Sequence, residues 1–196
     1  MLTPVRTVDP SAGITLVTLA EAKRHCRVDA ADEDLTIAAL VNSAVAYLDG
    51  YSGILGRALL TQTWQQDFGA FDDVMRLPVG NLLGVTSVTY YDVNNAQQTL
   101  SASVYSALSD GLGPCIVRAY NKVWPDTYSR PDAVRVTWTA GYGAAAANVP
   151  PPIRQAVLLL VGHWYANREA VTTDTSSAEL PLGVAALLAP YRRVAT

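Results

Sequence analysis

A chain of 196 residues, half of them hydrophobic, is long enough for a single domain with a sizeable core. Its net charge is −3, whereas sequence-specific DNA-binding domains usually have an excess of basic residues. No apolar run is long enough to span a bilayer. Cys26 and Cys115 lack zinc or redox spacing, so we expect reduced thiols in a soluble protein that has no signal peptide and is made in the cytoplasm.

Residues 1–17 are predicted to form an amino-terminal arm, because prolines and a glycine interrupt any periodic pattern. Thr18 then stands three residues before Glu21, which is the spacing of a capping box at the start of a helix. We expect a short helix from this point to about Val28. Together with the next helix, it would form the first part of a helical core over residues 18–59.

The next predicted helix begins at an acidic run, Asp32-Glu33-Asp34, and ends before Gly50. It carries two apolar stripes at helical spacing. One stripe comprises Leu35, Ala38, Val41, Val45 and Leu48, and the other comprises Ile37, Leu40, Ala44 and Tyr47. A helix that is apolar on two sides must be covered on both, so the second stripe faces either more of the subunit's own core or a neighbouring subunit. It is therefore the candidate subunit interface.

The low charge of the chain bears on the same question. Charged residues make up 16% of the sequence, whereas about a quarter is usual in soluble domains. Burial of part of the surface in an assembly would explain this deficit. A composition rich in alanine explains it equally well, so the two interpretations remain open.

Residues 60–141 change character and predict a small antiparallel β module. β-branched and aromatic residues alternate with polar ones, and the turn Asp92-Val93-Asn94-Asn95 joins two arms of a hairpin. The expected strands cover residues 61–68, 85–91, 97–100, 116–120 and 134–140. Because helical segments precede and follow it, the module is an insertion in the helical core.

Pro150, Pro151 and Pro152 lead into a long apolar helix that would form the second part of the core, residues 142–170. The fold class is thus α+β: amino-terminal helices plus a long carboxy-terminal helix, with the β module inserted. Residues 171–196 are a polar linker and a short amphipathic tail, too short to be stable alone. The tail must order on its own domain or on a partner.

A search for catalytic, cofactor-binding or metal-binding residues finds none. His25 and Cys26 are adjacent on a helix and point in different directions, so they do not form a catalytic pair. His163 lies within the apolar helix, where a hydrogen-bonded core histidine is the expectation. Two histidines exclude a three-histidine metal site, and no phosphate loop or nucleophile elbow occurs. We therefore expect neither an enzyme nor a cofactor.

The order of several short segments resembles a known family. These segments are Leu19-Ala20-Glu21-Ala22-Lys23, Gly56-Arg57-Ala58-Leu59-Leu60, Ala140-Gly141-Tyr142, His163-Trp164-Tyr165-Ala166-Asn167 and Leu187-Leu188-Ala189-Pro190-Tyr191-Arg192. In this order, from about residue 15 to the end, the chain is similar to the head–tail connector, or adaptor, family of long-tailed bacteriophages and phage-derived gene transfer agents.

This resemblance implies a non-enzymatic virion subunit, assembled in the bacterial cytoplasm. Twelve copies would form a ring under the portal protein, extend the channel through which DNA passes without sequence-specific binding, and dock the next tail-side protein. The portal-binding tail would comprise Val184, Leu187, Leu188, Tyr191, Arg192 and Arg193.

Three alternatives remain open at this point. The chain could be a stopper or a tail terminator, which are other tail-side ring proteins. It could also be a carbohydrate-binding module whose platform comprises Trp64, Tyr90, Tyr91, Trp124 and Trp138. The tail could fold back on its own domain instead of reaching the portal.

Overall fold

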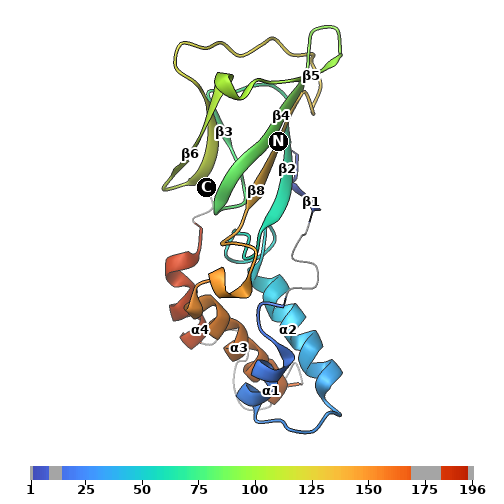
Figure 1. The fold of residues 1–196 in the computed structure, drawn as a ribbon, viewed down its shortest axis with the longest axis vertical. Coiled ribbons are helices and arrows are strands. Elements are labelled where there is room, and N and C mark those ends of the chain that lie inside the picture. Colours follow the sequence, from blue (N-terminus) through green and yellow to red (C-terminus); the bar gives the residue numbers. More distant parts are fainter. Residues whose placement is uncertain (1, 9–14, 169–181, 194–196) are drawn as a thin grey trace.

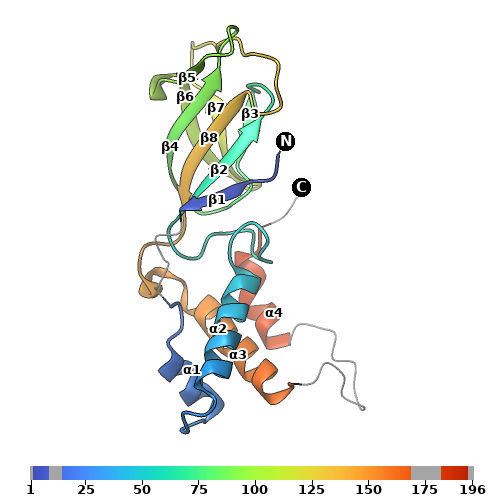
Figure 2. The same cartoon turned by 90° about the vertical axis from the view of Figure 1, so that its right-hand side faces the viewer.

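The computed structural model describes residues 2–8, 15–168 and 182–193. The molecule is elongated, with helices gathered at one end and strands at the other (Figure 1). A view turned by 90° shows the same separation (Figure 2). In chain order, strands β2 to β8 lie between helices α2 and α3. This arrangement confirms the predicted α+β class, a helical core with an inserted antiparallel β module.

Helix α1 covers Leu19–Cys26 and begins with the predicted capping box. The backbone amide of Thr18 donates to the Glu21 carboxylate at 2.8 Å, and the amide of Glu21 donates to the Thr18 hydroxyl at 3.2 Å. The helix ends at Arg27, whose φ of 58° is left-handed. Glu21 also accepts from Arg154 at 2.8 Å, so the same residue that caps α1 ties it to α3.

Helix α2 covers Asp34–Leu48 and has one buried face rather than the two separate stripes predicted. The buried positions draw on both stripes and are Ile37, Val41, Ala44 and Leu48. Their spacing of four, three and four residues defines a single helical face. Leu35, placed in the first stripe, is instead 87% exposed.

Helices α3 (Pro151–Ala166) and α4 (Leu182–Leu188) complete the helical end. Prolines occupy the first turn of α3, where a missing amide donor costs nothing. Its buried residues are Ile153, Ala156, Val157, Leu160 and Val161. Helices α2 and α4 both pack on α3, which is therefore the centre of the helical core.

Two antiparallel sheets form the other end. The five-stranded sheet has the order β1-β2-β8-β4-β5, with β1 at Val5–Val8, β2 at Gln62–Phe68, β4 at Leu82–Tyr91, β5 at Gln97–Thr99 and β8 at Val134–Ala140. The three-stranded sheet has the order β3-β7-β6, with β3 at Val74–Arg76, β6 at Tyr105–Asp110 and β7 at Gly113–Arg118. Short 3-10 turns η1, η2 and η3 lie at Ala102–Val104, Ala146–Asn148 and Ala189–Tyr191.

The strands β2, β4, β5, β7 and β8 correspond to the five that the sequence predicts, with shifts of a few residues at their ends. Strands β3 and β6 were not predicted, and neither was β1, which lies in the arm. β1 pairs with the edge of β2, so at least Val5–Val8 of the arm is part of the sheet.

The molecule has two hydrophobic clusters, one at each end. The helical cluster includes Ile37, Leu48, Leu55, Leu59, Ile153, Leu160, Val184 and Leu188. The β cluster lies between the two sheets and includes Trp64, Met75, Leu77, Val88, Ile116, Val136 and Trp138. Trp64 and Trp138 stand directly opposite each other on β2 and β8, as a cross-strand pair at the centre of this cluster.

Asp49, which follows α2, connects the two ends of the molecule. Its carboxylate accepts from the Leu59 amide at 2.8 Å and from the Gln62 side chain at 2.7 Å. Gln62 is the first residue of β2 and is buried, so its amide needs this partner. The hydrogen bonds fix the end of α2 against the start of the sheet.

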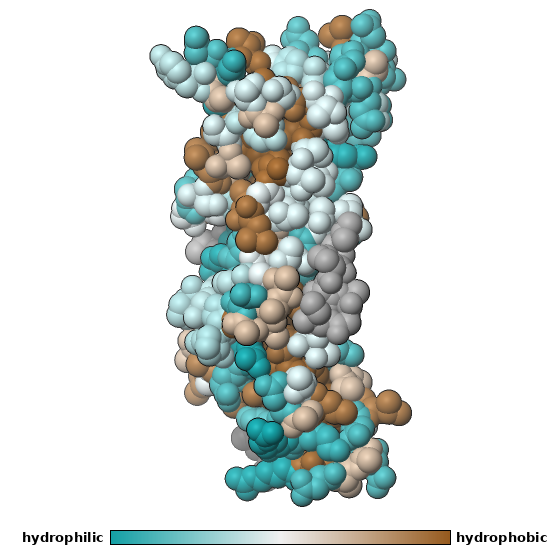
Figure 3. All heavy atoms as spheres, viewed as in Figure 1, coloured by the Kyte–Doolittle hydropathy of each residue, from teal (hydrophilic) through white to brown (hydrophobic). Residues whose placement is uncertain are grey.

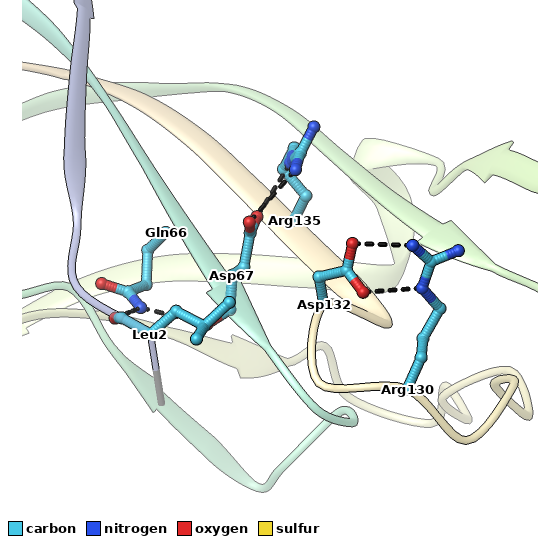
Figure 4. Close-up of polar contacts among 6 residues, drawn as sticks. All are labelled: Leu2, Gln66, Asp67, Arg130, Asp132 and Arg135. Carbon is cyan, nitrogen blue, oxygen red and sulfur yellow. Dashed lines mark hydrogen bonds and ion pairs between the residues drawn. The ribbon is translucent and has the colours of Figure 1, made fainter.

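Polar side chains at the β end link β8 to β2, brace the segment before β8 and tie the arm to the sheet (Figure 4). Arg135 on β8 donates to both carboxylate oxygens of Asp67 on β2, at 2.8 and 3.1 Å. Arg130 makes the same fork with Asp132, at 2.6 and 2.8 Å, in the segment before β8. The side chain of Gln66 donates to the carbonyl of Leu2, which ties the arm to β2.

Candidate interaction surfaces

The structure bears first on the predicted absence of a metal site. Within the described chain, no group of three or more His, Cys, Asp or Glu residues could hold a metal ion. His163 is exposed on α3, contrary to its predicted place in the core, because it lies on the outer face of that helix. Burial raises the pKa of the Cys26 thiol, which makes it a poorer nucleophile.

Across residues 2–8, 15–168 and 182–193, every helix is too short or too polar to cross a membrane.

The tail helix α4 is folded back on its own subunit. Val184 and Leu188 have no exposed surface and belong to the helical cluster. Their apolar side chains are therefore core residues in this structure, and they are not available to grip a partner. Leu187 and Tyr191 are partly buried, whereas Arg192 is exposed.

Polar contacts fix the end of the tail against the β end. Arg57 donates from Nε to the carbonyl of Tyr191 at 2.7 Å. The amide of Arg193 donates to the carbonyl of Leu55 at 3.0 Å, and its guanidinium donates to the carbonyl of Leu77 at 2.9 Å. The apolar face of α4 thus contacts α3. The last described residues of the tail contact the backbone at Leu55 and Leu77 and the side chain of Arg57.

The predicted subunit interface on α2 divides into buried and accessible residues. Ile37 and Ala44 have no exposed surface, so in this conformation they serve the subunit's own core. Leu40 is partly buried and Tyr47 is 37% exposed. The Tyr47 ring stands edge-on to Trp164 of α3, with ring centroids 6.3 Å apart. Leu40 and Tyr47 are the members of the set that a neighbour could reach.

The distal end of the β module presents apolar side chains on a well-anchored loop between β7 and β8. Trp124 stacks on Phe71 with ring centroids 4.7 Å apart, and the amide of Tyr128 donates to the carbonyl of Tyr91. From this loop Tyr120 is 99% exposed and Val123 is 79% exposed. Figure 3 shows that apolar residues reach the surface at both the strand end and the helix end of the molecule.

The aromatic residues considered as a carbohydrate platform do not form one. Trp138 has no exposed surface and Trp64 is only 6% exposed, because both lie in the core between the sheets. Trp124 is covered on one face by Phe71. A platform needs exposed ring faces, so the structure gives this alternative no support.

The sequence did not reveal that Arg57 contacts the tail, nor that the β6–β7 hairpin does so through the Leu112 carbonyl, which accepts from Nε of Arg193 at 3.0 Å. Arg57 was recognised only as part of a family segment. In the sequence, Arg57 is simply an arginine among apolar residues. This pattern does not predict its hydrogen bond to the carbonyl of Tyr191, which lies 134 residues later in the chain.

Comparison with known proteins gives a consistent result. The family model of the head completion protein matches residues 15–194, which is nearly the whole chain. Comparison with curated protein sequences gives no significant match.

Similar solved structures come from gene transfer agent (GTA) particles. One is described as the neck of an empty particle computed with C6 symmetry (TM-score 0.76, 24% identity) and another as the virion of a native particle (TM-score 0.74, 24% identity). A third is the neck of a native particle computed with C12 symmetry (TM-score 0.73, 22% identity). Each comparison covers 100% of this chain and 97% of the other, so the likeness extends over the whole fold.

The family match confirms the resemblance to head–tail connectors that the sequence motifs indicated, and the expectation that the protein is not an enzyme. The chain belongs to the head completion protein family, and its role is structural.

Proposed function

We propose that the chain is a head–tail connector subunit that forms a ring of twelve copies under the portal protein. The ring extends the channel for DNA and offers its opposite side to the next tail-side protein. The observation that carries this proposal is the family match over residues 15–194. The similarity of the whole fold to neck chains, one set computed with C12 symmetry, supports it. The net charge of −3 suits a channel wall along which DNA moves without adhering.

We further propose a division of labour along the chain. The helical parts, residues 18–59 and 142–170, would build the ring, and the β insertion, residues 60–141, would project from it. The arm, residues 1–17, would attach to the insertion, and residues 171–196 would be the linker and portal-binding tail. The separate hydrophobic clusters of the two ends support this division.

For the contact between subunits we propose the face of α2 around Leu40 and Tyr47. Both side chains lie on one side of the helix, seven residues apart, and keep accessible apolar surface beside Trp164. Ile37 and Ala44 would support this face from below, because they pack in the core under it. Partly exposed aromatic residues are enriched at protein interfaces.

For the portal contact we propose the outer face of the docked tail, with Leu187, Tyr191 and Arg192 reaching the portal. Val184 and Leu188 would hold α4 on α3, and Arg193 would hold the end of the tail on the β end. Deletion of residues 182–196 would also remove core side chains. Point substitutions are therefore the cleaner test.

The decisive experiment is electron microscopy of intact particles carrying the chain. We expect density for twelve copies between the portal and the next tail-side protein. Absence of the chain from the neck would refute the proposal, and presence in another ring of the tail would favour a stopper or terminator.

Two matched pairs of variants test the surfaces. Leu40→Gln should reduce incorporation into the ring, whereas Leu35→Gln, the same change on the opposite exposed side of α2, should not. Leu187→Gln should reduce attachment to the portal, whereas Ala39→Gln, at an exposed position on α2, should not. Melting temperatures of the isolated variants show whether a loss of assembly reflects a loss of fold. Equal assembly within a pair would exclude the surface concerned.

A further inference from the structure

A recess of about 300 Å³ lies between the end of the tail and the hairpin that joins β6 to β7. Three arginines line it: Arg57, from the segment after α2, and Arg192 and Arg193, from the tail. Asp110 is the acidic residue in the lining. In a chain with fewer basic than acidic residues, this is a local concentration of positive charge.

The positive charges of the recess are not neutralised by carboxylates. Arg57 donates to the carbonyl of Tyr191 at 2.7 Å and to the side-chain oxygen of Asn81 at 2.7 Å. Arg193 donates to the carbonyls of Leu112 and Leu77, at 3.0 and 2.9 Å. Within the described chain, none of the three arginines forms an ion pair. The four hydrogen bonds use two of the five N–H donors of Arg57 and two of the five of Arg193, so each guanidinium keeps donors for a ligand.

Asp110 forms its ion pair with Arg76, outside the three arginines of the recess. Arg76 donates to its carboxylate at 2.7 Å, and the amide of Leu112 donates to the same oxygen at 2.9 Å. Hydrogen bonding to Arg76 is the main cause that lowers the pKa of Asp110. The carboxylate is thus engaged at the rim. Burial, and then the charges of Arg57 and Arg76, lower the pKa of Arg193, and the negative charge of Asp110 offsets only part of this effect.

The backbone holds the two inner guanidinium groups in place. Gly113 has a φ of 113°, and a Cβ there would lie 2.7 Å from Nε of Arg193. A Cβ on Gly80 would lie 3.1 Å from Cγ of Arg57. Because glycine has no side chain, both arginines pack closely against the backbone, and two hydrogen bonds hold each guanidinium. Planar, fixed guanidinium groups are suited to bidentate binding of a carboxylate.

We propose that this recess binds a carboxylate from an acidic segment of a partner protein, with Arg192 closing over it from the rim. A concave site of this size admits a side chain or a chain end. Duplex DNA presents its phosphates on a convex surface, which protruding cations reach more easily than recessed ones. The inference does not depend on the proposed ring, because it rests on the geometry of a single subunit.

The test uses the full chain and three probes: a fluorescent hexaglutamate peptide, the matching hexaglutamine peptide and a short DNA duplex. We expect binding of the glutamate peptide alone, weakening as salt rises because the attraction is between charges. The main variant is Arg192→Gln, since this side chain is exposed and supports no other described contact. It should weaken binding by up to about fivefold, which is the expected loss for one solvent-exposed ion pair. The control Arg24→Gln removes an exposed arginine from α1 and should leave binding unchanged.

A second measurement covers the inner arginines, whose loss could loosen the tail. Hexaglutamate should raise the melting temperature of the wild type and of Arg24→Gln, and should not raise that of Arg57→Gln. No binding of the glutamate peptide by the wild type, or equal binding by Arg192→Gln and the wild type, would overturn the proposal. Preference for the DNA duplex would overturn the choice of a protein partner.

Discussion

Replacing Leu188 with alanine tests whether the tail helix is part of the folded subunit. The side chain of Leu188 has no exposed surface and packs in the helical cluster where α4 meets α3. The substitution removes three carbon groups, worth about 2.4 kcal/mol at about 0.8 kcal/mol each. The cavity left behind adds to this loss, and collapse of a terminal helix reduces it. We expect the free energy of unfolding to fall by about 3 kcal/mol.

The assay is thermal unfolding followed by far-UV circular dichroism, which reports mainly on the helices. For a chain of this length, about 3 kcal/mol corresponds to a fall in melting temperature of about 6–12 °C. Leu182→Ala is the matched control, because Leu182 stands on the same helix but is 85% exposed, and it should change the melting temperature little. If both variants melted with the wild type, α4 would not be docked in solution and the assignment of Leu188 to the core would fail.

Three further predictions follow from single contacts. The pKa of Glu21 is lowered, chiefly by the hydrogen bond from the amide of Thr18, so its ionised form stabilises the fold above about pH 4.5 and this contribution is lost as the pH falls through the lowered value. The stability advantage of the wild type over Glu21→Gln, measured by urea unfolding, should therefore shrink towards pH 3 or so. Gly141→Ala should cost about 1–3 kcal/mol in the same assay, because φ is 144° and the new Cβ would lie 2.5 Å from the Leu60 carbonyl oxygen. Asp67→Asn should cost about 1 kcal/mol by breaking the fork with Arg135, and a double-mutant cycle with Arg135→Gln should return most of that as coupling.

The sequence predicted the strands whose inner residues alternate with polar ones. In β8, for example, Val134, Val136 and Trp138 are buried at alternate positions, and this pattern is visible without a structure. Strand β3 has only three residues, too few to show alternation, and four of the six residues of β6 are serine, alanine or aspartate, which have low strand propensity. Both form because they pair with the two sides of β7. Such pairing depends on neighbours distant in sequence, so local patterns do not reveal it.

The faces of α2 illustrate the same limit on a helix. Periodicity identified the correct apolar residues but assigned them to two stripes, whereas the buried face takes Ile37 and Ala44 from one and Val41 and Leu48 from the other. Whether apolar positions on adjacent sides of a helix form one buried face or two depends on which elements pack against them. In this subunit α1 and α3 cover a single broad face, and this depends on the tertiary arrangement.

The tail shows why sequence could name the residues of a contact but not the surface that they contact. A stripe such as Val184 and Leu188 fits any apolar groove, whether in α3 or in a partner. Covalent attachment decides the competition in a single subunit, because a tethered helix meets its own α3 at a high effective concentration. A partner that displaced α4 would have to offset the burial of both side chains. A partner that bound the exposed outer face around Leu187 and Arg192 would lose none of it. For the proposed portal contact, the docked structure therefore favours a tail that binds by its outer face over a tail that must first leave α3.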